Sequence, residues 1–144
     1  MIGAEPLRPA LSGPMSACDT LAMKVVNSNP VLAVHDLALS AAWYRDVLGC
    51  EVREADPGNW MFCRSGEIDF MLGRCPDVVP ASALGDHSYV AYLRVDDVEA
   101  FHDRAVDAGA EILKPPTDEP WGMRELGLRS PDGHRFMLAQ PSAG

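Results

Sequence analysis

The chain contains an internal repeat, and this repeat limits its possible folds more than any other feature. The segment VHDLALSAAWYRDVLGCEV (34–52) matches VDDVEAFHDRAVDAGAEI (95–112) once a single residue is skipped. Each copy has a short apolar strand, an acidic helix start, a helix, a glycine and a new strand. Both copies continue to a tryptophan, a pair of strands and the tripeptide Phe-Met-Leu, at 70–72 and 136–138. Self-similarity of this kind predicts two copies of one supersecondary unit.

Capping residues mark the ends of the predicted helix in each copy. Asp36 and Asp96 or Asp97 stand where a helix begins, and their carboxylates can accept the unpaired backbone N–H groups of a first turn. Gly49 and Gly109 suit the left-handed position that follows a helix. Apolar residues recur at helical spacing between these marks. The expected apolar faces are Leu37, Ala41, Tyr44 and Leu48 in the first helix and Val98, Phe101, Ala105 and Ala108 in the second.

The turns in each copy complete the predicted fold. RSGE and SPDG each separate two short strands and are consistent with tight hairpins. The sequence therefore predicts an α+β fold with two βαβββ modules, at about 28–74 and 87–140, joined by the proline-containing linker 75–86. Their mixed sheets are expected to curve around a shared cavity, within a single domain over residues 28–144. Residues 1–27 are expected to form a mobile N-terminal extension.

The net charge of −9 limits the partners that the chain can take. Such a field repels phosphate backbones and anionic membranes, so neither nucleic acid nor a membrane is an expected partner. No run of apolar residues approaches the length of a membrane span, and the N-terminus lacks the apolar core of a signal peptide. The four cysteines form no CxxC pair, which argues against a zinc knuckle and favours free thiols in the cytoplasm.

The repeat and two of its segments resemble a known superfamily. Paired βαβββ modules are similar to the vicinal-oxygen-chelate superfamily, which includes glyoxalase I, extradiol dioxygenases, and fosfomycin- and bleomycin-resistance proteins. The segments NPVLAVHDLALSAAWYRDVLGCEV and EPWGMRELGLRSPDGHRF most resemble the bleomycin-resistance branch, where a Pro-Trp-Gly-Arg-Glu-Phe strand and an Asp-Pro-x-Gly turn are typical. This chain differs from that pattern by an inserted Met123, by Leu126 in place of Phe and by Ser130 in place of Asp.

The resemblance also implies where a catalytic metal would lie. Enzymes of the superfamily hold a divalent metal with His, Glu or Gln on the first and last strands of both modules. The corresponding residues of this chain are Asn29, Val90, Met71 (or Asp69) and Met137. Valine cannot coordinate a metal, and a thioether is a poor ligand for the metals that these enzymes use. We therefore predict no metal and no other cofactor.

The residues that share a sheet face with these positions form the predicted ligand-binding wall. Strand alternation identifies them, because every second side chain points to the same side of a sheet. They are Asn29, Val31, Ala33, Asp69, Met71, Val90, Tyr92, Arg94, Arg135 and Met137. Two alternatives are that these residues fill a core, or that Arg94 and Arg135 pair with Asp69.

Two tryptophans and an Arg-Glu pair complete the candidate site. Trp60 and Trp121 are placed to stack on a planar or cationic ligand. By the resemblance, Trp121 corresponds to the tryptophan that lines the drug groove of bleomycin-binding relatives, and Arg124 and Glu125 correspond to the Arg-Glu pair of that branch. The alternatives are a core or dimer-interface role for Trp121, and an ion pair within the sheet for Arg124 and Glu125.

These features favour a metal-free protein that sequesters a cationic or aromatic small molecule. The resemblance implies a homodimer and a role in antibiotic resistance. No nucleophile elbow, phosphate loop, dinucleotide fingerprint or HExxH motif is present in the sequence, so no catalytic residue is predicted. One alternative is a metal-dependent enzyme with displaced ligands such as Asp69, Glu125 or His87. Another is a metal-free lyase or isomerase, with Asp69 or Glu125 as base and Arg94 or Arg135 stabilising an oxyanion. A purely structural or protein-binding role is the third.

Overall fold

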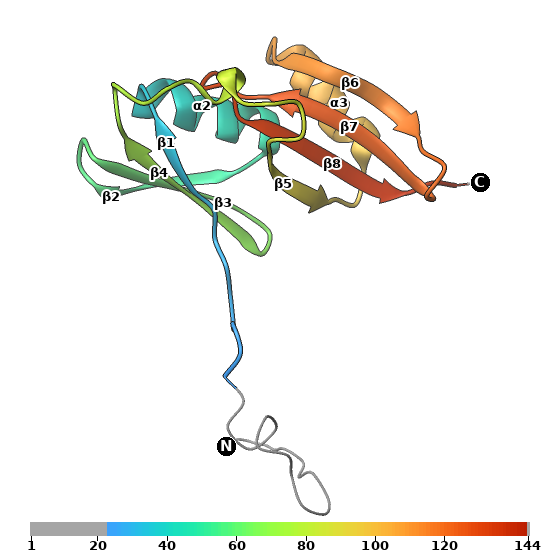
Figure 1. Ribbon diagram of the computed structural model, residues 1–144, viewed down its shortest axis with the longest axis horizontal. Helices are drawn as coiled ribbons and strands as arrows, with labels where there is room; N and C mark the ends of the chain where they lie inside the picture. Colours follow the sequence, from blue (N-terminus) through green and yellow to red (C-terminus); the bar gives the residue numbers. More distant parts are fainter. Residues whose placement is uncertain (1–22, 144) are drawn as a thin grey trace, which may run out of the picture.

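The computed structural model describes residues 23–143, which form the two predicted βαβββ modules (Figure 1). Module 1 comprises β1 (Val31–Val34), α2 (Leu37–Leu48), β2 (Glu51–Asp56), β3 (Trp60–Ser65) and β4 (Ile68–Arg74). Module 2 comprises β5 (Tyr89–Arg94), α3 (Val98–Asp107), β6 (Glu111–Asp118), β7 (Met123–Arg129) and β8 (Arg135–Pro141). The linker between them contains one short 3-10 turn, Ala81–Ala83. The α+β prediction is confirmed.

Each module builds its own four-stranded mixed sheet. The strand orders are β1-β4-β3-β2 and β5-β8-β7-β6. The first strand of each module runs parallel to the last, and the remaining neighbours are antiparallel. No strand of one sheet pairs with a strand of the other within residues 23–143. The modules must therefore be held together by side chains and turns.

The helix boundaries follow the capping residues. Asp36 accepts a hydrogen bond from the backbone N–H of Leu39 at 3.0 Å and begins α2. For the second helix the sequence left two candidates, and the structure selects Asp97, which accepts from the N–H of Ala100 at 3.0 Å. Gly49 ends α2 with φ 69° in the left-handed region, where a β-carbon is disfavoured.

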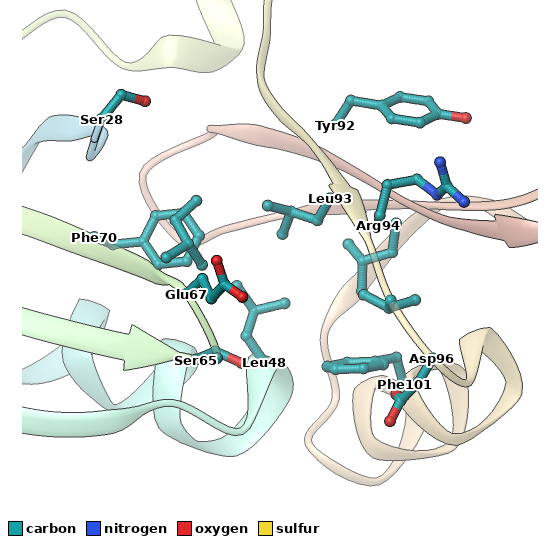
Figure 2. Close-up of a pocket in the computed structure, with 14 residues that line it drawn as sticks. Ser28, Leu48, Ser65, Glu67, Phe70, Tyr92, Leu93, Arg94, Asp96 and Phe101 are labelled. Carbon is teal, nitrogen blue, oxygen red and sulfur yellow. The ribbon is translucent and has the colours of Figure 1, made fainter. Parts of the chain in front are cut away.

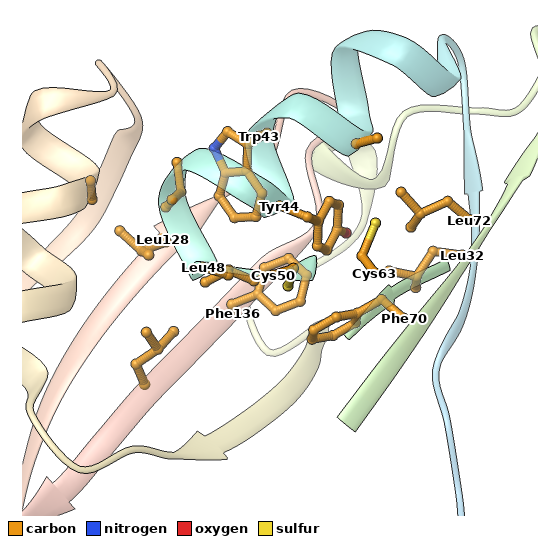
Figure 3. Close-up of a cluster of buried hydrophobic side chains, with 14 of the residues drawn as sticks. Leu32, Trp43, Tyr44, Leu48, Cys50, Cys63, Phe70, Leu72, Leu128 and Phe136 are labelled. Carbon is orange, nitrogen blue, oxygen red and sulfur yellow. The ribbon is translucent and has the colours of Figure 1, made fainter. Parts of the chain in front are cut away.

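An aromatic cluster lies where the two modules meet. Phe70 of β4 and Phe136 of β8 are fully buried, with ring centroids 5.6 Å apart and planes at 86°. Tyr44 of α2 packs against both rings, and Trp43 packs against Phe136 (Figure 3). Edge-to-face contacts of this kind are favoured by the charge distribution of aromatic rings. The modules thus share one hydrophobic core on the helix side of both sheets.

A buried carboxylate reinforces this junction. Asp132, in the β7–β8 turn of module 2, is only 4% exposed. Its carboxylate accepts hydrogen bonds from the backbone N–H of His35 at 2.8 Å and from the hydroxyl of Ser40, both in module 1. Its backbone carbonyl accepts from the N–H of Ala81, which fixes the linker to the same turn. One residue therefore connects both modules and the segment between them.

The imidazole of His35 is part of the same junction. Its Nδ1 lies 2.9 Å from Asp132 Oδ1, and its Nε2 lies 2.7 Å from the carbonyl oxygen of Val78. Both partners are acceptors, so both ring nitrogens donate only when the imidazole is protonated. These hydrogen bonds, first to Val78 and then to Asp132, raise the pKa of His35 above its ordinary value of 6.5.

The N-terminal part of the described chain makes few contacts. Residues 23–28 run away from the body of the domain (Figure 1), and the side chains of Met23, Val25 and Val26 are exposed. The rest of the predicted extension, residues 1–22, lies outside the described residues. In the part of the chain that the structure describes, neither helix is long and apolar enough to cross a membrane.

The protonated form of His35 is expected to stabilise the fold at mildly acidic pH relative to a His35→Gln variant. Because folding raises its pKa, the contribution is complete below pH 6.5 and is lost as the pH rises through the folded-state pKa. Urea denaturation of both proteins across this range should show a difference in unfolding free energy that shrinks with rising pH. In an Asp132→Asn background the pH dependence of this difference should be reduced, and a difference independent of pH would contradict the assignment.

Candidate functional site

The open face of the module 2 sheet carries a buried carboxylate with three donors. Glu125 of β7 is 3% exposed. Its Oε2 accepts hydrogen bonds from the Tyr92 hydroxyl at 2.6 Å and from Trp121 Nε1 at 2.8 Å. Its Oε1 accepts from Lys114 Nζ at 3.0 Å, and the same ammonium group donates to Glu119. These five side chains are called the Glu125 cluster below.

The Glu125 cluster stabilises the charged form of its carboxylate. Burial alone would raise the pKa of Glu125, but the hydrogen bonds from Tyr92, Trp121 and Lys114 outweigh burial and lower this pKa. Burial and the hydrogen bond to Glu125 raise the pKa of Tyr92, so the phenol remains the donor. A carboxylate that accepts several hydrogen bonds is expected to behave in this way. Glu125 is therefore ionised at neutral pH and held rigidly.

Two aromatic side chains of the cluster remain accessible. Trp121 is 64% exposed and Tyr92 is 50% exposed, although both have their polar atoms bound to Glu125. The ammonium of Lys114 lies 6.0 Å from the centroid of the Trp121 ring, within the range of a cation–π contact. The tethered polar atoms fix the orientation of both rings while leaving ring surface open to solvent. Such surface is suited to stacking on a planar or cationic molecule.

Module 1 presents a related arrangement around Asp69. This carboxylate of β4 is 5% exposed, and it accepts hydrogen bonds from Arg53 at 2.5 Å and from Arg64 at 3.2 Å. The side-chain oxygen of Asn29 accepts from the backbone N–H of Asp69 at 3.2 Å. The alternative that Asp69 pairs with Arg94 or Arg135 is therefore wrong. Arg64 faces Asp69 directly across the β3–β4 pair, whereas Arg53 reaches the same carboxylate from β2 and makes the shorter contact.

The other candidates of module 1 lie near this carboxylate. Met71 is half-buried and pairs with Val31 across β1 and β4. The ring of Trp60 covers Gly73, and a β-carbon at Gly73 would lie only 2.8 Å from that ring. Trp60 is therefore half-buried against its own sheet. The structure brings Asn29, Asp69 and Met71 together and leaves Trp60 less accessible than Trp121.

The arginines predicted for the binding wall have different roles. Arg135 is 5% exposed, and its guanidinium donates to the carbonyl oxygens of Leu84 and Gly85 in the linker. It therefore holds the linker against β8. Arg124 extends to the other side of the sheet, where it pairs with Glu99 at 2.6 Å.

Arg124 also pairs with Asp118 of β6 at 3.1 Å, and Glu125 pairs with Lys114 of β6, so each forms an ion pair within the sheet but not with the other. Strand alternation explains this result, since consecutive residues of β7 point to opposite faces. Of the three predicted arginines, Arg94 and Arg135 have no salt-bridge partner among the described residues, and Arg135 donates instead to backbone carbonyls.

The four positions implied for a metal do not form a suitable ligand set. Met137 pairs with Tyr92 in the β5–β8 register. A register shift between Tyr89 and Ala91 interrupts the alternation of β5, and Val90 packs against the hydrophobic core. Val90 is therefore not on the predicted wall. Residues 23–143 contain no group of three or more His, Cys, Asp or Glu side chains arranged to hold a metal ion.

A cleft of about 750 Å³ lies between the modules, beside β5. Figure 2 shows Leu93 pointing into it toward Phe70, whereas Tyr92 and Arg94 point to the other side of the strand. Tyr92 and Arg94 nevertheless line the edge of the cleft, so the cleft adjoins the face that carries the Glu125 cluster along β5. Strand alternation along β5 accounts for the opposite directions of Leu93 and its two neighbours.

Several residues of the site were not predicted from the sequence. They are Lys114 and Glu119 in module 2 and Arg53 and Arg64 in module 1. Arg64 had a usable signal, because a tight turn after Ser65 places it opposite Asp69. Arg53 and Lys114 had none, since the β2–β3 and β6–β7 pairs both contain register shifts.

The match to a family profile decides the identity of the fold. The profile of the Glyoxalase/Bleomycin resistance protein/Dioxygenase superfamily matches residues 25–138. The chain belongs to this superfamily. The predicted resemblance is thereby confirmed at the level of the superfamily.

Solved structures of other proteins share the fold of this superfamily with the chain. The bleomycin resistance determinant encoded on the transposon Tn5 superposes with a TM-score of 0.67 at 24% identity, covering 82% of this chain and 99% of that protein. TioX from Micromonospora sp. ML1 gives the same TM-score and identity, with 82% and 100% coverage. Lactoylglutathione lyase from Agrobacterium tumefaciens gives 0.60 at 19% identity, with 83% and 95% coverage. At these identities the likeness concerns the fold.

Curated relatives match over a shorter segment. The uncharacterized protein Rv0887c of Mycobacterium tuberculosis is 37% identical over 60 residues, which is 42% of this chain and 35% of that protein. The uncharacterized protein Mb0911c of Mycobacterium bovis is 37% identical over 60 residues, covering 42% of this chain and 40% of that protein. The chain thus matches well under half the length of these relatives.

Protein produced with supplemented nickel, zinc, manganese and iron is expected to contain well below one metal ion per chain. The reason is that Val90, Met71 and Met137 supply no suitable ligand atoms at three of the four positions. Metal content by mass spectrometry of the purified protein tests this directly. A stoichiometric metal would contradict the ligand assignment and would direct attention to Asp69, Glu125 and His87.

Proposed function

We propose that this protein binds and sequesters a cationic or aromatic small molecule without a metal, as a member of the bleomycin-resistance-like branch. The observation that carries the proposal is the Glu125 cluster, with two accessible aromatic rings oriented by one buried carboxylate. Preorganised aromatic surface lowers the entropic cost of binding a planar ligand. The likeness of the fold to the Tn5 bleomycin resistance determinant supports the same class of ligand.

Charge supports a cationic ligand in particular. The Glu125 cluster contains two carboxylates, Glu119 and Glu125, and one ammonium group, Lys114. The net charge of the chain is −9, which attracts cations at long range. An aromatic cation could stack on Trp121 within this field.

The two buried carboxylates are poorly placed to act as general bases. Glu125 already accepts three hydrogen bonds, and its pKa is lowered. Asp69 is engaged by Arg53 and Arg64. A base must be within reach of the proton it removes and have a pKa near the working pH. These contacts favour binding over the lyase or isomerase alternative.

We also place the protein in the cytoplasm, where thiols remain reduced. Cys50, Cys63 and Cys75 are free. Burial raises the pKa of Cys50 to about 12 and that of Cys63 to about 11, so both thiols stay protonated and unreactive. These two cysteines serve as small apolar residues of the core.

Substitution of Trp121 by Ala should weaken binding of metal-free bleomycin by more than about fivefold, because accessible aromatic residues commonly dominate binding free energy. Titration followed by tryptophan fluorescence measures this, since Trp43 and Trp60 remain as reporters. The matched control is Leu39→Ala, which truncates an apolar residue of similar exposure on α2. No binding by the wild type, or equal effects of both substitutions, would refute the proposed site. Expression in a sensitive host then tests whether binding confers resistance.

The exposed sheet faces support a homodimer as part of this proposal. Val31 is 62% exposed on the open face of module 1, and Trp121 is 64% exposed on that of module 2. Apolar residues gathered on one face are typical of an interaction surface. A symmetric dimer is the commonest way to bury such a face.

A Val31→Asp substitution is expected to convert a dimer to a monomer, because it would bury an unpaired charge in the interface. Light scattering during size-exclusion chromatography measures the mass against the 15.6 kDa of one chain. Leu39→Asp introduces the same charge on an exposed apolar residue of α2 and should leave the dimer intact. A monomeric wild type at micromolar concentration would exclude the dimer.

A further inference from the structure

The cleft between the modules is large enough for a small molecule and adjoins the Glu125 cluster at Tyr92. Its volume of about 750 Å³ falls within the usual range for ligand pockets. One wall is the β3–β4 turn of module 1, residues 65–68, and the other is the β5 segment 92–96 of module 2. Figure 2 shows these walls facing each other across the gap. Sites of this kind are common at the boundary between two structural units.

The interior of the cleft is apolar and aromatic. Phe70 and Leu138, both fully buried, lie at its base, together with Leu48 of α2. Phe101 of α3 contributes a second aromatic ring from the module 2 side, and Leu93 points inward from β5 (Figure 2). Leu93 and Phe101 are only partly buried, so a ligand with an aromatic body would remove their exposed surface from water and gain the corresponding hydrophobic free energy.

The charged residues that line the cleft are two acidic ones, Glu67 and Asp96, and one basic one, Arg94. Glu67, in the β3–β4 turn, directs its carboxylate into the space between the modules (Figure 2). Asp96 lies beside Phe101 at the opposite wall. Neither carboxylate has a salt-bridge partner in the described part of the chain. The guanidinium of Arg94 points away from Glu67, so it does not neutralise the site.

The backbone of β5 adds hydrogen-bonding groups. This strand is at the edge of its sheet and pairs only with β8, so its other edge has no strand partner within residues 23–143. An unpaired edge presents backbone carbonyl and N–H groups to whatever lies beside it. The carbonyl oxygens on this edge of β5 can accept hydrogen bonds from a protonated amine, as the carboxylates of Glu67 and Asp96 can.

We propose that the cleft between the modules is a second binding site, which takes a protonated or quaternary amine attached to an aromatic body. The aromatic part lies among Phe70, Leu93 and Phe101, and the cation lies toward Glu67. The residues that carry this inference, Glu67, Leu93 and Phe101, are not members of the Glu125 cluster, so it does not depend on the function proposed above.

Two fluorescent dyes of similar aromatic character and opposite charge test the ligand class. Thioflavin T is a cation, and 1-anilinonaphthalene-8-sulfonate is an anion. Glu67→Gln is expected to weaken binding of thioflavin T by about fivefold, the effect of losing one partly exposed ion pair, and not to weaken binding of the anionic dye. Phe101→Ala is expected to weaken both dyes, because it removes part of the shared apolar wall.

Matched variants inside and outside the cleft show where thioflavin T binds. Glu54→Gln removes an exposed carboxylate of β2 outside the cleft and should leave thioflavin T binding unchanged. Thioflavin T is itself an aromatic cation, so the fluorescence titrations of the glutamate and Phe101 variants are compared in a Trp121→Ala background, which removes binding at the Glu125 cluster. Amide chemical shifts on titration should move at residues 65–68 and 93–96. Equal losses in the two glutamate variants, or shifts confined to the surroundings of Trp121, would overturn the proposal. So would binding that falls as protein concentration rises, which would show that a second copy fills the cleft.

Discussion

The buried carboxylate of Asp132 is the interaction on which the arrangement of the two modules depends. The sheets share no strand pair in the described part of the chain, so main-chain hydrogen bonding does not set their relative position. Asp132 lies in a turn of module 2 and binds the start of module 1 through His35 and Ser40. The aromatic contacts of Phe136 with Tyr44 and Phe70 supply the apolar part of the same junction. Because this junction is on the helix side, the opposite face of each sheet remains open.

The two modules place a carboxylate on that open face in different ways. In module 1, Asp69 is paired with two guanidinium groups, from Arg53 and Arg64. In module 2, Glu125 is bound by one ammonium group and two aromatic donors. A buried carboxylate requires such partners, because an unpaired one would be strongly destabilising. The second solution leaves the more exposed aromatic rings, those of Trp121 and Tyr92, and this difference makes module 2 the better candidate for ligand binding.

The candidate site could be predicted from the sequence only where strands alternate regularly. Regular alternation correctly placed Tyr92 beside Met137 and Asn29 beside Asp69. It failed for Val90, because a register shift in β5 breaks the period. It also gave no information about the partners of each charge. Those partners depend on the register of neighbouring strands, and the β2–β3 and β6–β7 registers contain shifts that no local pattern reveals.

The sequence by itself determined the two modules, their helices and their turns, because these depend on local signals such as N-cap aspartates, glycines after helices and periodic apolar residues. The tertiary structure alone decided that Arg135 holds the linker, that Arg124 faces away from Glu125 and that a cleft separates the modules beside β5. Each of these outcomes depends on which residues distant in the chain come into contact. The physical reason is that charge pairing and cavity shape arise from the packing of whole elements, which nearest-neighbour patterns do not encode.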